Sequence, residues 1–329
     1  MENHPTIGWC GRATARRTAV ALGISCVGDQ PMSSQEVPIP TLTADWIVGL
    51  SDGDSHIENA LNRLNEAVTK FGKSFSVSGE VPGCSALAAQ HASLVEHLRS
   101  HLAVAQSLWG VRMKEHLFDL VHALQSDRVF VAALVSRAIL ETAAAIVNLE
   151  GKLVAPPADA PGDHFQGMLD ELHGTVGRGR YPWDAWGDSK AMAEHFSVYR
   201  AGEDPELPSE RRATNILTMI QKLDRAVARR FADVARRASR VGYEGAVRAT
   251  YALLSDICHP AAGTGILLLE PGARAGWIRV NYTTSGSATR WLFAGPIGPL
   301  LLIPPVARVA YESLERLGNI AFDVSKPNA

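Results

Sequence analysis

The sequence predicts a mainly α protein, a helical bundle with one small β-hairpin near residues 264–283. Apolar residues recur at helical spacing over most of the chain between residues 54 and 258. Residues 127–149 are apolar on nearly every side, which is typical of a central helix. After His259 and Pro260 the pattern changes to two short runs of strand-forming residues.

The composition indicates a soluble globular protein. Of the 329 residues, 46% are hydrophobic and 20% are charged, and the formal net charge is −2, so any nucleic-acid-binding surface would be local. The most apolar run, residues 293–306, is too short to span a membrane and contains four prolines. The four cysteines form no CxxC pair, which predicts reduced thiols in a cytoplasmic protein.

The same signals divide the chain into two regions. Residues 1–40 are predicted to form a disordered leader, in which Met32 is a candidate start. Residues 41–329 are predicted to form a single helical domain, with the hairpin and the last helix in residues 264–323.

The first helix of this domain has the clearest signals. Asp54 or Ser55 can cap its N-terminus, and Gly72 is expected to close it. Its apolar positions follow helical spacing and are Ile57, Leu61, Leu64, Val68 and Phe71. Residues 73–85 are interpreted as a linker.

Periodicity also predicts the remaining elements. Residues 86–125 are expected to be helical, with a break near Gly110. Pro304 and Pro305 suit the start of the last helix. The later helices and strands are expected at residues 127–149, 212–241, 243–258, 265–270, 276–282 and 306–322.

A polar stripe crosses the central apolar helix. Arg137, Glu141 and Asn148 fall within about 40° of one another at 100° per residue. If this helix is buried, its charges need partners, because unpaired buried charges are costly. One interpretation is therefore a functional site; the other is an i,i+4 ion pair that satisfies itself at the edge of the core.

A second polar face lies on the helix that ends at His259. Tyr251, Ser255 and His259 follow one another at intervals of four residues. Solvent exposure alone explains such a face. A site is favoured by the position of His259 in the last turn, where the helix dipole stabilises its cation. Pro260 ends the helix there, so we expect His259 to face the Arg137–Glu141 pair rather than bulk water.

These two segments carry a resemblance. SRAILETAAAIVNL (136–149) and YALLSDICHP (251–260) resemble a family of uncharacterised bacterial helical proteins with an R-x-x-x-E helix and a later Y-x-x-L-S-x-x-x-H-P helix end. That family is similar to the HEPN domains, small helical units often found in toxin–antitoxin and phage-defence systems. The resemblance covers about residues 110–265 and implies a HEPN-like core there.

Many HEPN domains are metal-independent ribonucleases with an R-x(4–6)-H motif at a helix end. The resemblance implies that His259 takes the place of the motif histidine. The motif arginine is missing, because the positions five and six residues upstream hold Leu254 and Leu253. Arg137 on the facing helix is an alternative source of the cation, and whether the chain is an enzyme is left open.

Cleavage of RNA without a metal needs a base, an acid and a cation for the phosphorane. His259 suits proton transfer, and Arg137 or Arg248 suits the phosphate. Supporting roles, orientation of the histidine and contacts to phosphate oxygens, are predicted for Glu141, Tyr251 and Ser255. This chemistry requires no metal and no cofactor.

A basic stripe suggests a second polyanion contact. Arg225, Arg229, Arg236 and Arg240 fall within about 60° on a continuous helix over residues 212–241. A solvated helix face is the alternative interpretation. The segment 178–186 combines arginine with three aromatic residues, which can stack bases or anchor a loop.

Two functional hypotheses follow. In the first, the chain is a HEPN-like helical protein that binds or cleaves RNA in a defence or toxin context. In the second, it is a non-catalytic helical protein that binds a helical partner or forms a homodimer. Neither hypothesis involves a membrane.

Overall fold

The protein is described by a computed structural model for residues 38–75, 94–154, 215–259, 269–271, 273–275, 277–280, 283 and 287–320. The chain divides into two units, Met1–Pro38 and Ile39–Ala329. Most of the predicted leader, most of the predicted linker 73–85 and the whole of segment 178–186 lie outside the described residues.

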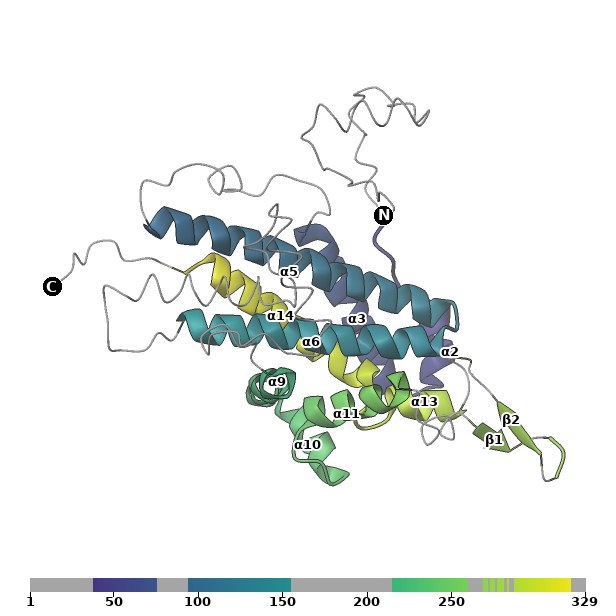
Figure 1. The fold of residues 1–329 in the computed structure, drawn as a ribbon. Coiled ribbons are helices and arrows are strands. Elements are labelled where there is room, and N and C mark those ends of the chain that lie inside the picture. Colours follow the sequence, from purple (N-terminus) through teal and green to yellow (C-terminus); the bar gives the residue numbers. More distant parts are fainter. Residues whose placement is uncertain are drawn as a thin grey trace, which may run out of the picture. The chain divides into compact units, whose positions relative to one another are not determined.

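The described part of the second unit is mainly helical (Figure 1). In chain order its elements are α2 (Ala44–Ser51), α3 (Ser55–Ser74), α5 (Leu94–Gln125), α6 (Val129–Val154), α9 (Ile216–Arg230), α10 (Ala232–Arg240), α11 (Ala246–Cys258), β1 (Leu269–Pro271), β2 (Ile278–Val280), α13 (Ser287–Ala294) and α14 (Pro299–Gly318).

Helix α3 confirms the predicted cap and apolar face. The Asp54 side chain accepts hydrogen bonds from the backbone N–H groups of His56 and Ile57, which satisfies two donors that a helix start leaves without partners. All five predicted apolar positions are buried. Gly72 does not close the helix, which continues to Ser74. A Cβ at Gly72 would lie 2.9 Å from the Ile39 side chain, so this glycine serves close packing.

Helices α5 and α6 form a helical hairpin. The turn between them uses Asp127 in a left-handed conformation (φ 54°), and the Arg128 N–H donates to the Ala123 carbonyl at 2.8 Å. The predicted break near Gly110 is wrong, because α5 continues through it. A Cβ at Gly110 would lie 2.2 Å from the ring of Phe75, so glycine is needed here for close contact rather than for a bend.

Helix α14 begins earlier than predicted. It starts at Pro299, so Pro304 and Pro305 lie inside the helix rather than at its start. Proline has no N–H, so the carbonyls of Leu300 and Leu301 lose their α-helical donors. Every residue from 299 to 307 is buried. Packing on all sides therefore stabilises a helical conformation that local propensity disfavours.

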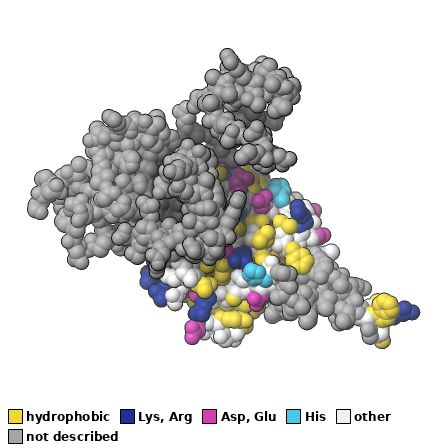
Figure 2. Space-filling model, viewed as in Figure 1, with side chains coloured by type: hydrophobic (Ala, Val, Ile, Leu, Met, Phe, Trp, Pro, Cys, Tyr) yellow, Lys and Arg dark blue, Asp and Glu magenta, His cyan; other side chains and the backbone are white. Residues whose placement is uncertain are grey.

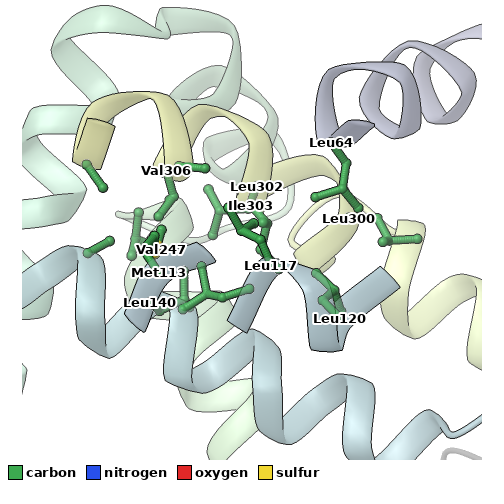
Figure 3. Close-up of a cluster of buried hydrophobic side chains, with 14 of the residues drawn as sticks. Leu64, Met113, Leu117, Leu120, Leu140, Val247, Leu300, Leu302, Ile303 and Val306 are labelled. Carbon is green, nitrogen blue, oxygen red and sulfur yellow. The ribbon is translucent and has the colours of Figure 1, made fainter. Parts of the chain in front are cut away.

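Helix α6 has a central position. It packs against α5, α9, α11 and α14, while α14 also packs against α3 and α5. Figure 1 shows α5 and α6 alongside one another, with α14 in yellow. The core between α3, α5, α6, α11 and α14 is mainly aliphatic and also includes Met113, Phe71 and Phe118. Figure 3 shows part of its aliphatic cluster, with Met113.

The central helix α6 is less buried than the apolar stretch that ends in α14. Two helical stretches, Val129–Leu153 and Leu292–Gly318, are long and apolar enough to cross a membrane. The most apolar window of the first is 61% buried in the protein and that of the second 67%. Core helices of soluble proteins meet the same criterion, so the expectation of no membrane contact stays a prediction.

Two short strands follow α11. β1 and β2 pair antiparallel, with Leu269 opposite Val280 and Pro271 opposite Ile278. Each strand has three residues, and most of residues 260–286 lie outside the described part. The larger hairpin expected over residues 264–283 therefore stays a prediction.

Candidate functional site

A polar network joins the central helix α6 to α11. Arg137 Nε donates to Glu141 Oε1 at 3.0 Å, and the Tyr251 hydroxyl donates to the same oxygen at 3.0 Å. Arg137 Nη2 lies 3.4 Å from Tyr251 Oη, and the guanidinium lies 5.3 Å from the centre of the tyrosine ring. The predicted i,i+4 ion pair is confirmed, and a side chain from the facing helix completes it.

The start of α11 is fixed by α9. Asp224 on α9 accepts a hydrogen bond from the backbone N–H of Val247 at 3.0 Å and so caps α11 across the helix interface. Gly245 makes this approach possible, because a Cβ there would lie 1.6 Å from an Asp224 carboxylate oxygen. This contact sets where α11, and with it Tyr251, lies on the bundle.

Arg137 and Tyr251 keep their ordinary charge states at neutral pH. Burial lowers the pKa of Arg137, but hydrogen bonds to Glu141 and Tyr251 outweigh it, so that pKa is raised. Burial, followed by the hydrogen bond to Glu141, raises the pKa of Tyr251. The Tyr251 hydroxyl is therefore a hydrogen-bond donor here rather than a base.

Two titratable side chains near this network were missed in the sequence. His116 on α5 has a lowered pKa, chiefly through burial and then through Arg112, while Asp119 and Glu141 oppose the shift. Its Nε2 is buried and has no hydrogen-bond partner among the described residues. Nothing in the sequence around His116 indicates that its side chain is buried near Glu141.

Cys258 is the other side chain that was missed. Burial raises the pKa of its thiol, Glu141 raises it further, and Arg137 opposes the shift. A helical wheel could have found it, because a residue seven positions after Tyr251 lies within about 20° of it. Ser255 and His259, chosen from the same wheel, lie farther round the helix.

His259 is not where the sequence placed it. The helix ends at Cys258, and His259 is an exposed C-cap residue in an extended conformation (φ −86°, ψ 143°). The residue before a proline is driven out of the helical region, so the imidazole leaves the face that carries Tyr251. The expectation that His259 faces Arg137 rather than water is therefore wrong. Ser255 is partly buried, and its carbonyl accepts the His259 N–H.

Asn148, the last residue of the predicted stripe, belongs to a separate contact. Its side chain is only 2% exposed, and its carbonyl oxygen accepts a hydrogen bond from Lys222 Nζ on α9 at 2.7 Å. Arg137 and Glu141 meet α11 instead. The stripe on α6 thus divides between two neighbouring helices.

The predicted arginine stripe is interrupted. Phe231 (φ −129°, ψ 69°) separates α9 from α10, so Arg225 and Arg229 lie on a different helix axis from Arg236 and Arg240. All four side chains are exposed. Figure 2 shows basic side chains gathered at the lower left, over α9 and α10. The sequence contains no Gly or Pro at this break.

Neither a metal-binding cluster nor a known relative identifies the site. Among the described residues there is no group of three or more His, Cys, Asp or Glu side chains that could hold a metal ion. No family model matches the chain, and the comparisons with curated proteins and with solved structures give no match either.

Proposed function

We propose that this chain is a HEPN-like helical protein that binds RNA through the basic segment formed by residues 222–248, in a defence or toxin context. This segment contains eight Lys or Arg residues and three Asp or Glu residues, whereas the whole chain has a net charge of −2. A local excess of positive charge is what a polyanion-binding site needs in a protein of near-neutral overall charge.

The proposal rests on four exposed arginines of this segment that have no carboxylate partner within the described part of the chain. Arg225, Arg229 and Arg240 are exposed and have no ion pair within the described part of the chain. Arg236 is exposed and only donates to the Ala232 carbonyl of its own helix, at 3.4 Å. Guanidinium groups without carboxylate partners remain available for phosphate oxygens.

Cleavage is the more demanding part of the proposal. His259 is exposed at the end of α11, where it can exchange protons with a bound strand. Arg137 is held by Glu141, so it would have to leave that carboxylate to bind a phosphate. We therefore place RNA binding first and treat cleavage as a second step, tested by His259→Ala in an assay with labelled RNA.

The test of binding uses three double variants of matched charge. Arg225→Ala/Arg229→Ala probes α9 and Arg236→Ala/Arg240→Ala probes α10, which must be separated because the two helices have different axes. Arg112→Ala/Arg128→Ala removes two exposed arginines from α5 and the α5–α6 turn and is the control. Affinity for a single-stranded RNA is measured by fluorescence anisotropy at several salt concentrations.

We expect weaker binding by both test variants, and a slope of log K against log salt reduced by about 1.4 for two lost phosphate contacts. The control should keep the parent slope. Absence of RNA binding by the parent chain at physiological salt, or equal losses in all three variants, would exclude the basic segment as the site.

A specific observation favours a second candidate, a non-catalytic protein that forms homodimers. Phe130 and Leu134 lie one turn apart on α6 and are 48% and 57% exposed. Neighbouring exposed apolar side chains on a helix are typical of interaction surfaces. Sedimentation equilibrium of the parent and of Leu134→Glu tests this candidate: a dimer that the substitution dissociates supports it, and a monomeric parent excludes it.

A further inference from the structure

A cavity lies between α3, α10 and α14, away from the Arg137 network. Its volume is about 120 Å³. The residues that line it are His56, Asn59, Ala60, Arg63, Phe231, Asp233, Val234, Arg237, Leu301, Pro304 and Pro305.

Three features of the chain create this cavity. His56, Asn59 and Arg63 are spaced at helical intervals, so they share one face of α3. The break at Phe231 redirects the chain into α10, which brings Asp233 and Arg237 to the cavity. On the third side, Pro304 and Pro305 of α14 supply apolar walls without N–H donors.

The lining has more basic than acidic groups. Arg63, Arg237 and His56 are set against a single carboxylate, that of Asp233. Arg237 Nη1 lies 3.8 Å from Asp233 Oδ2, beyond hydrogen-bonding distance. The Asp233 side chain is 55% exposed, so it can turn to water when an anion enters.

Arg237 has a hydrogen-bond donor that is not satisfied within the described part of the chain. Its Nε is buried and has no hydrogen-bond partner among the described residues. A buried N–H donor of a charged group without an acceptor is unfavourable, so native proteins seldom leave one unsatisfied. Nε is closed to solvent, so an oxygen atom of a ligand would satisfy it only after the Arg237 side chain turns. The side chain as a whole is 28% exposed, and the Arg63 guanidinium adds a second positive charge to the lining.

We propose that this cavity binds a phosphate-class oxyanion, with Arg237 and Arg63 as its principal contacts. A cavity of this volume has room for one phosphate group. The sugar and base of a nucleotide would have to remain outside. The cavity shares Asp233 and Arg237 with the basic segment of residues 222–248, but none of the four arginines tested for RNA binding lines it, so different variants test the two proposals.

The experiment is calorimetric titration of the full chain with inorganic phosphate at constant ionic strength, with chloride as the reference anion. Arg237→Gln and Arg63→Gln should each weaken phosphate binding by about tenfold or more, as expected for a charged hydrogen bond. Asp233→Asn should tighten it, because a repulsive carboxylate is removed. Arg112→Gln, an exposed arginine outside the cavity, should leave binding unchanged. Thermal unfolding of each variant verifies the fold.

A second titration, with a nucleoside monophosphate, identifies the source of the phosphate. Tighter binding than inorganic phosphate indicates a nucleotide, and equal or weaker binding indicates free phosphate. The proposal is overturned if the parent shows no saturable binding of either ligand. It is also overturned if Arg112→Gln loses as much affinity as Arg237→Gln, or if Asp233→Asn weakens binding.

Discussion

The hydroxyl of Tyr251 and the carboxylate of Glu141 lie 3.0 Å apart and join α11 to the central helix α6. Arg137 donates to the same carboxylate oxygen at the same distance. This oxygen therefore accepts two hydrogen bonds, one from its own helix and one from the helix that ends at the candidate histidine. Separation of the two helices would break the Tyr251 hydrogen bond and leave the Arg137–Glu141 pair within α6.

We predict that Tyr251→Phe lowers the free energy of unfolding by about 1–2 kcal/mol, because a half-buried hydrogen bond to a charged acceptor is lost. Glu141→Gln alone should have a smaller effect, since the Glu141 side chain is 37% exposed. A double-mutant cycle measured by urea unfolding checks the pair. A coupling energy near zero would show that the two residues act independently.

We predict that Gly245→Ala lowers the free energy of unfolding by roughly 1–3 kcal/mol, because the new Cβ would overlap the Asp224 carboxylate at the start of α11. Gly151→Ala is the matched control: it lies inside α6 with no atom within 4 Å of the added Cβ. There alanine should stabilise by up to about 1 kcal/mol. Equal effects of the two substitutions in thermal unfolding would contradict the described cap.

We predict that His116 destabilises the protein in mild acid. Its pKa in the folded chain is lowered from 6.5, chiefly by burial, so folding favours the neutral ring. The stability that this group contributes is complete above pH 6.5 and is lost as the pH falls from there through the folded pKa. The variant His116→Asn should flatten the fall of unfolding free energy in this window. The exposed His122, substituted in the same way, is the control and should leave the slope unchanged.

We predict that Lys222→Ala lowers the free energy of unfolding by about 1–3 kcal/mol, because the buried side-chain oxygen of Asn148 loses its hydrogen-bond donor. The double variant Asn148→Leu/Lys222→Met, which replaces both partners with apolar groups, should recover most of this loss. Chemical unfolding measures all three chains. A double variant less stable than Lys222→Ala would show that the amide makes a contribution beyond this one bond.

Signals that act over a few residues gave the correct local structure. The cap at Asp54, the buried face of α3 and the pairing of Arg137 with Glu141 depend only on spacing along one helix, and all three are observed. Such features need no knowledge of which elements meet. The mainly helical character of the chain follows from the same periodicity.

Features that depend on partners from other elements were misread. Gly72 and Gly110 look like helix breakers, but both lie within helices because Ile39 and Phe75 pack closely against them. Pro304 and Pro305 lie within α14 because its surroundings bury the helix on all sides. Local propensity was overruled by tertiary packing in each case.

The candidate site was predicted only in part. Arg137, Glu141 and Tyr251 meet, but His259 leaves the helical face because of the following proline. His116 comes from a different helix, and nothing in its own sequence neighbourhood shows that Glu141 lies nearby. Identifying it required knowledge of how α5 and α6 pair.

Helix α14 packs against α3, α5 and α6, which come much earlier in the chain. During synthesis, α3, α5 and α6 emerge from the ribosome well before the residues that fill the space between them. Until α14 arrives, the nascent chain exposes the apolar surfaces that Leu300 and Ile303 later cover. Such surfaces are targets for chaperones and for aggregation. Folding of this bundle is therefore expected to finish only after α14 has been synthesised. We expect the yield of folded protein to depend on the chaperones that protect the exposed surfaces until then.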